Sequence, residues 1–125
     1  MDAPALENLD LACAKKGKTI AKSPSKELEK LVTNALAVLE EQGIYALFLF
    51  LKTRGDENVS KELRKFLKKT PKQAPLLSDN NDVFASLQQI GNDLDKLLLA
   101  RDLVRQTLVY ARYHARVPQK SEVQT

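Results

Sequence analysis

The sequence has few of the residues that build disulfides and metal sites: among 125 residues there are one cysteine, one histidine and no tryptophan. Because Cys13 is alone, it cannot form an intramolecular disulfide, which excludes a disulfide-stabilised scaffold and fits a reducing cytoplasm. A metal site needs several histidine, cysteine or carboxylate ligands at suitable spacing, and the sequence shows no such group. We therefore expect no metal and no cofactor.

The sequence also lacks the motifs that carry catalysis. Its four glycines lie at predicted turns and form no phosphate-binding loop. Cys13 has no histidine within a recognisable nucleophile motif. His114 falls on the apolar side of the last predicted helix, where we expect it to have a packing role. We predict no catalytic residue and no enzymatic activity.

Long hydrophobic runs are missing as well. The longest covers the eight residues 44–51, whereas a helix needs roughly 20 apolar residues to cross a bilayer. The first twenty residues are polar and contain lysine, unlike a secretory signal. From these features we expect a cytoplasmic protein without membrane contact.

What the sequence does contain is typical of one globular domain over residues 1–125, with 43% hydrophobic and 29% charged residues. Apolar residues recur at helical spacing, and residues 44–51 have no second convincing strand to pair with. The predicted fold is therefore an all-α bundle of five or six helices. Because residues 44–51 are apolar on all sides, we expect that helix at the centre of the bundle or under a partner subunit.

Local signals set the predicted boundaries. Asp2 or Ala3 is expected to cap a first helix that starts at Pro4, and Gly17 is expected to end it. The lysine-rich residues 15–24 are predicted to be a flexible basic linker. The remaining predictions are a helix start at Ser23 and Pro24, a loop over 70–81, a helix capped by Asp79 or Asn81, and a frayed tail over 118–125.

Positive charge gathers first on the helix predicted over residues 57–69, in a chain with a net charge of +4. One side of this helix is apolar and the other is cationic, with only Glu62 to offset it nearby. A solvated lysine face is the ordinary interpretation. The alternative is contact with phosphates, because flexible lysines bind polyanions without reading sequence. The predicted nucleic-acid-binding residues here are Lys61, Arg64, Lys65, Lys68, Lys69 and Lys72.

A second group of cations lies on the last helix, predicted over residues 92–117. Four arginines spaced four, seven and four apart fall within about 60° of one another on a helical projection. They either complement the helix dipole and pair with Asp102, or bind nucleic acid. Tyr113, beside them, is the best candidate for base stacking. The predicted nucleic-acid-binding residues of this arginine stripe are Arg101, Arg105, Arg112 and Arg116.

Two segments resemble the small, all-helical subunit of CRISPR effector complexes: LVTNALAVLEEQGIYALFLFLK over 31–52 and LLLARDLVRQTLVYARYHAR over 97–116. The similarity is closest to the small subunit of type I-D Cascade, which resembles the C-terminal domain of that system's large subunit, and to the type III-B small subunit. The resemblance consists of helix patterns without a signature motif, so it assigns no individual family residue.

This resemblance implies a non-catalytic bundle that stacks in several copies along guide RNA and target nucleic acid. Such a subunit would contact the nucleic-acid backbone and bridge the large and backbone subunits of the effector complex. The two groups of cations would be the matching positions. This interpretation fails for any cation that the folded protein locks in a pair with an acid.

Two other classes of protein stay open. A protein–protein adaptor without nucleic-acid contact would use the surface of residues 44–51 and keep its lysines as solubility charges. A helix-turn-helix transcription factor would need base-reading side chains on a compact second helix, and the lysine-rich face of residues 57–69 argues against it.

Overall fold

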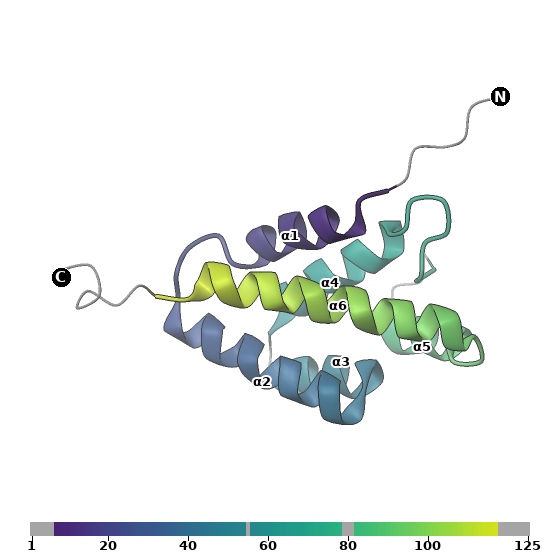
Figure 1. Ribbon diagram of the computed structural model, residues 1–125. Helices are drawn as coiled ribbons and strands as arrows, with labels where there is room; N and C mark the ends of the chain where they lie inside the picture. The colour runs from purple at the N-terminus through teal and green to yellow at the C-terminus, as the bar shows by residue number, and fades with distance from the viewer. Residues whose placement is uncertain (1–6, 55, 79–81, 118–125) are drawn as a thin grey trace.

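The computed structural model describes residues 7–54, 56–78 and 82–117, and these residues form six α-helices and no strand (Figure 1). The predicted all-α bundle is therefore confirmed. The helices are α1 (Leu9–Ile20), α2 (Lys26–Gln42), α3 (Ile44–Thr53), α4 (Glu57–Lys69), α5 (Val83–Ile90) and α6 (Leu94–Ala115).

The longest helix, α6, runs through the middle of the bundle, with α1 along one side and α2 along the other (Figure 1). Because neighbours cover two of its sides, α6 buries more surface than the sequence predicts: Leu108 and Ala115 are buried as well. His114 is exposed, so the prediction that it packs in the core was wrong. A helical projection shows the side on which a residue lies, but not where along the axis the neighbouring helices end.

Helix α1 continues through Gly17 to Ile20, so the prediction that Gly17 ends the helix was wrong, as was the linker over residues 15–20. The glycine serves packing instead. A Cβ atom at this position would lie 2.7 Å from the Tyr110 Cβ and 2.9 Å from the Ala111 amide nitrogen. Glycine therefore allows α1 to approach α6 more closely than any other residue would.

The start of α1 also differs from the prediction. The helix begins at Leu9, and the side chain of Asn8 caps it by accepting a hydrogen bond from the Leu11 N–H at 2.9 Å. The predicted start at Asp2, Ala3 and Pro4 lies outside the described residues, as does the predicted tail over 118–125.

Helix α2 begins later than predicted, because Ser25 rather than Ser23 caps it. The Ser25 hydroxyl accepts a hydrogen bond from the Leu28 N–H at 3.2 Å. The Ser25 N–H in turn donates to the Ala115 carbonyl at 2.8 Å, which ties the start of α2 to the end of α6. At its other end α2 stops at Gly43, whose φ of +98° lies in the region that favours glycine.

The prediction that residues 44–51 are helical is confirmed, because they lie in α3. The helix does not lie at the centre of the bundle, which was one of the two positions expected for it. It packs against α2, α4 and α5 at the side of the bundle. Tyr45 and Leu49 are 39% and 44% exposed, so one side of the helix faces solvent. The buried residues of α3 are Ile44, Leu47, Phe48 and Leu51.

Helix α4 has the predicted bounds, and the loop that follows it is anchored as expected. Leu76 and Leu77 are buried, and both of their N–H groups donate to the Leu67 carbonyl at 3.1 Å. The next helix, α5, is capped by Asp82, which accepts from the Phe84 N–H at 3.0 Å. The prediction of a cap at Asp79 or Asn81 was therefore wrong, and both residues lie outside the described part of the chain.

Candidate nucleic-acid interface

Helix α4 owes its orientation to a capped start and a strongly apolar side. Asp56 accepts a hydrogen bond from the Val59 N–H at 2.8 Å and so satisfies one of the free donors at the helix start. The apolar side then packs into the bundle and turns the opposite side to solvent. The buried residues are Val59, Leu63, Phe66 and Leu67.

The cations of α4 and the loop after it form what we call the α4 lysine face. The structure places all six predicted residues on the solvent side of α4 or just after it, four of them exposed and two half-buried. Arg64 donates from Nε to the Ser60 carbonyl at 3.4 Å. Within the described residues, no acid lies within ion-pair distance of any of the six side chains. The face consists of Lys61, Arg64, Lys65, Lys68, Lys69 and Lys72.

Glu62, on the flank of this face, is held by another helix. Glu7 also lies close to the face, where its carboxylate accepts a hydrogen bond from the Lys72 N–H at 2.8 Å. Lys16 of α1 donates from Nζ to Glu62 Oε1 at 2.9 Å, and the two side chains are only 20% and 15% exposed. This hydrogen bond holds the pKa of the Glu62 carboxyl below its ordinary value. Among the described residues Glu62 therefore pairs with Lys16 and not with a lysine of α4, although the charges of Lys65 and Lys61 also help to lower its pKa.

The arginine stripe is bound to acids of α2. Arg101 lies 3.4 Å and Arg105 3.7 Å from the carboxylate of Glu40, and Arg101 also donates to the Glu40 carbonyl at 3.3 Å. Arg116 donates from Nε to Glu29 at 3.2 Å. Three of the four arginines therefore join α6 to α2, which counts against a nucleic-acid role for them.

The fourth arginine, Arg112, is half-buried, and the described residues offer it no acid within ion-pair distance. Next to it, Tyr113 is 63% exposed, as expected for a stacking candidate. The Arg116 guanidinium lies 5.5 Å from the centre of the Tyr113 ring, so one side of the ring is already covered. The predicted alternative partner, Asp102, is exposed and makes no ion pair within the described residues.

Sequence reasoning missed the lysines of α1. Because residues 15–24 were assigned to a linker, Lys15, Lys18 and Lys22 were not placed on any fixed surface. In the structure, Lys15 and Lys18 lie on the outer side of α1, Lys22 follows its end, and all three are exposed. The available signal was the composition of residues 9–22, in which four lysines stand against one aspartate.

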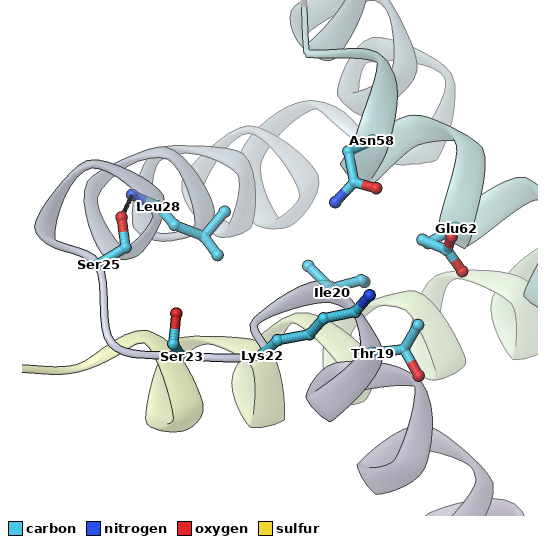
Figure 2. A pocket seen from close by; sticks show the side chains of 8 residues that line it. All are labelled: Thr19, Ile20, Lys22, Ser23, Ser25, Leu28, Asn58 and Glu62. Carbon is cyan, nitrogen blue, oxygen red and sulfur yellow. Dashed lines mark hydrogen bonds between the residues drawn. The ribbon is translucent and has the colours of Figure 1, made fainter.

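A pocket of about 280 Å³ lies where the end of α1 and the start of α2 meet the first turns of α4. Asn58 and Lys22 reach towards each other across it, and Ile20 and Leu28 form its apolar part (Figure 2). Its other lining residues are Thr19, Ser23, Ser25 and Glu62. Since Ser25 already caps α2 and Glu62 already binds Lys16, these two groups have structural partners.

Metal binding, thiol chemistry and membrane insertion find little support in the described residues. The described residues contain no cluster of three histidine, cysteine or carboxylate side chains suited to a metal ion. Burial raises the pKa of the Cys13 thiol, whose Sγ donates to the Leu103 carbonyl at 3.5 Å in the core. Among the described helices, none combines the length and hydropathy needed to span a membrane.

Comparison with protein-family models, curated proteins and solved structures gives no match.

Proposed function

We propose that this chain is a non-catalytic subunit that binds nucleic-acid backbone, and that it acts as the small subunit of a CRISPR RNA-guided, Cascade-like interference complex. In that role several copies stack along the guide RNA and the target or displaced DNA strand. They lie beside the large and backbone subunits. The observation that supports backbone binding is the α4 lysine face, a fixed helical surface of cations that make no ion pair within the described residues. The assignment to a CRISPR complex rests on the resemblance of residues 31–52 and 97–116 to that family of small subunits.

Binding to a nucleic-acid backbone needs a fixed surface of cations and does not need groups that recognise bases. Each lysine or arginine that neutralises a phosphate releases counterions, and this release drives association without base recognition. Lysines on a helix that is capped and packed into a core are held in register, so the entropy lost on binding is confined to their side chains. The α4 lysine face has these properties, because Asp56 caps the helix and four apolar residues fix its orientation.

The proposed contact surface is narrower than the sequence analysis predicts. Arg101, Arg105 and Arg116 would have to leave glutamates of α2 before they could bind phosphate. We therefore assign the backbone contacts to α4 and assign these three arginines to the α2–α6 packing.

A salt-titrated binding assay tests the proposal. Lys65→Glu combined with Lys68→Glu places two negative charges on the α4 lysine face. We expect weaker binding to single-stranded and duplex nucleic acid, and a slope of log K against log salt that is smaller by about two, one for each lost phosphate contact. The matched control is Lys26→Glu with Lys30→Glu, which makes the same change in charge at exposed positions of α2.

The two variants separate a local effect from one of net charge. If the α2 control weakens binding as much as the α4 variant, the α4 lysine face is not the site. If neither changes the affinity, nucleic-acid binding through these lysines is ruled out. Circular dichroism of both variants checks that the helices are intact.

A helical adaptor is the second candidate function, and exposed apolar residues favour it. Tyr45 and Leu49 of α3 are exposed, and at the start of α6 Leu94 and Leu98 are 65% and 46% exposed. Single exposed leucines are common on protein surfaces, so this observation has less weight than the lysines. An adaptor would bind nucleic acid only weakly, and that weak binding would be insensitive to salt.

A further inference from the structure

The lysines of α1 form a second row beside the α4 lysine face. On a helical projection Lys15 and Lys18 fall within about 60° of each other, and Lys22 follows the end of the helix. The only acid of this helix, Asp10, lies on the flank towards α6, where it accepts hydrogen bonds from Tyr110 at 2.8 Å and Gln106 at 3.3 Å. The outer side of α1 therefore carries positive charge and no acid, together with the exposed Leu11. We call Lys15, Lys18 and Lys22 the α1 row, and Lys61, Lys65 and Lys68 the α4 row.

Helices α1 and α4 lie antiparallel, since Lys16 meets Glu62 in the middle of both helices and the end of α1 meets the start of α4 at the pocket. Lys16 lies about 100° further round α1 than Lys15, and Glu62 lies about 100° further round α4 than Lys61. In antiparallel neighbours these equal rotations point towards each other. The Lys16–Glu62 pair therefore leaves the α1 row and the α4 row on the same side of the molecule.

The spacing of the rows suits two strands rather than one. Packed helix axes lie about 8–10 Å apart, which falls between the widths of the two grooves of B-form DNA, about 6 and 12 Å. The long, flexible lysine side chains can span the difference between the helix spacing and the groove width. The α4 row extends for about 10 Å along its helix, or roughly three phosphate steps along the axis of one strand of a duplex. Lys15 and Lys18 lie about 4.5 Å apart along α1, and Lys22 continues the α1 row beyond the helix end. A single strand that follows one row would leave the other row unused.

We propose that the α1 and α4 rows contact the two backbones on either side of one groove of a nucleic-acid duplex. This inference rests on the proposed function and extends it, because it names a duplex as the ligand and adds Lys15, Lys18 and Lys22 to the site. The α4 row contacts one strand and the α1 row contacts the other. Binding depends on the shape and charge of the duplex and not on its sequence.

The test compares a short B-form DNA duplex with one of its separate strands. The variant Lys15→Glu with Lys18→Glu changes only the α1 row. We expect its salt slope on the duplex to fall by about two, while its affinity for the single strand stays that of the unchanged protein. Lys65→Glu with Lys68→Glu is expected to weaken binding to both ligands, and the α2 control Lys26→Glu with Lys30→Glu is expected to weaken neither.

Each other result overturns a defined part of the inference. If the α1 variant binds the duplex as well as the unchanged protein while the α4 variant does not, the α1 row is not part of the site and the proposed function stands. If the α1 variant loses duplex and single strand equally, one strand crosses both rows and the two-backbone arrangement is wrong. If the α4 variant also binds normally, the proposed function fails together with the inference. Thermal unfolding of each variant shows that it is folded.

Discussion

The α4 lysine face and the arginine stripe of α6 are both regular rows of cations on amphipathic helices, yet the fold uses them differently. The lysines of α4 make no ion pair with an acid among the described residues, and Glu62 beside them is bound to Lys16. Three of the four arginines pair with Glu29 and Glu40 of α2. Cations in register on one helix are therefore available to a ligand only where the neighbouring helix brings no acid to them.

The two regions also differ in how much they depend on packing. The ion pairs between α6 and α2 are partly exposed, and each contributes little to stability. Lysines that face only solvent have free side chains and keep their full rotamer freedom until they bind. The predictions below test whether this division between a packing charge and a binding charge is correct.

The largest expected effect comes from the contact between α6, which carries the arginine stripe, and α1, which packs beside the α4 lysine face. Gly17 of α1 packs against α6, and an added Cβ would lie 2.7 Å from the Tyr110 Cβ and 2.9 Å from the Ala111 amide nitrogen. Gly17→Ala should therefore lower the free energy of unfolding by about 1–3 kcal/mol, because α1 must move away from α6. Urea unfolding followed by circular dichroism measures this change.

Gly91→Ala is the matched control for Gly17→Ala. Gly91 has φ −61° and lies between α5 and α6. The nearest atoms to an added Cβ would be the Gln88 carbonyl oxygen at 3.3 Å and the Leu87 carbonyl oxygen at 3.6 Å. We expect a change within about 0.5 kcal/mol in either direction. If Gly17→Ala proved as harmless as this control, close packing would not be the reason for glycine in α1.

A smaller effect is expected for the ion pair beneath the lysine rows. Glu62→Gln removes a charge that Lys16 stabilises, and should cost about 1 kcal/mol at neutral pH, since both side chains are mostly buried. Because the pKa of Glu62 is lowered in the folded protein, its contribution is present above the ordinary pKa of glutamate, about 4.3, and is lost as the pH falls through the lowered value. The difference between the two proteins should therefore disappear in acid.

Unfolding free energies measured from neutral to acidic pH test this prediction. Glu57→Gln, at an exposed position of the same helix, makes the same change in charge without removing an ion pair. If Glu57→Gln gave the same pH dependence as Glu62→Gln, the effect would reflect net charge and not the pair with Lys16.

The smallest effect is expected for the arginines. Arg101→Gln with Arg105→Gln releases Glu40 and should lower the free energy of unfolding by a few tenths of a kcal/mol for each pair, since these side chains are 36% and 45% exposed. The affinity for nucleic acid should change much less than in the Lys65→Glu, Lys68→Glu variant. An equal loss of affinity in the salt-titrated assay would contradict the division drawn here and return the arginine stripe to the binding site.

Local signals were enough to predict much of the fold. The helix from Glu57 to Lys69 was predicted with its correct bounds, because its cap, apolar period and lysine side all lie within one short stretch. Gly17 was misread because glycine ends helices as often as it permits close packing, and only the position of Tyr110 decides between the two. Ser23 and Ser25 are both good caps, and the Ala115 carbonyl that fixes Ser25 lies at the other end of the chain.

The candidate site was predictable only in part, because some of its contacts depend on residues far away in the sequence. The lysines of α4 were found because their side of the helix depends on the helix alone. Arg101 pairs with Glu40, 61 residues away in the sequence, and Lys16 pairs with Glu62, 46 residues away. Both ion pairs therefore depend on how the helices pack. The lysines of α1 were not assigned to a fixed surface, because residues 15–24 were predicted to be a linker, whereas the helix continues to Ile20.

The contact between α1 and α6 has a consequence for biosynthesis. Cys13 and Leu103, which meet in this contact, are 90 residues apart, and α6 follows the five other described helices in the chain. During synthesis the earlier helices leave the ribosome before their main packing surface has been made. Their apolar sides must wait for α6, so we expect the bundle to close late in translation and to fold more slowly than a bundle with only sequential contacts.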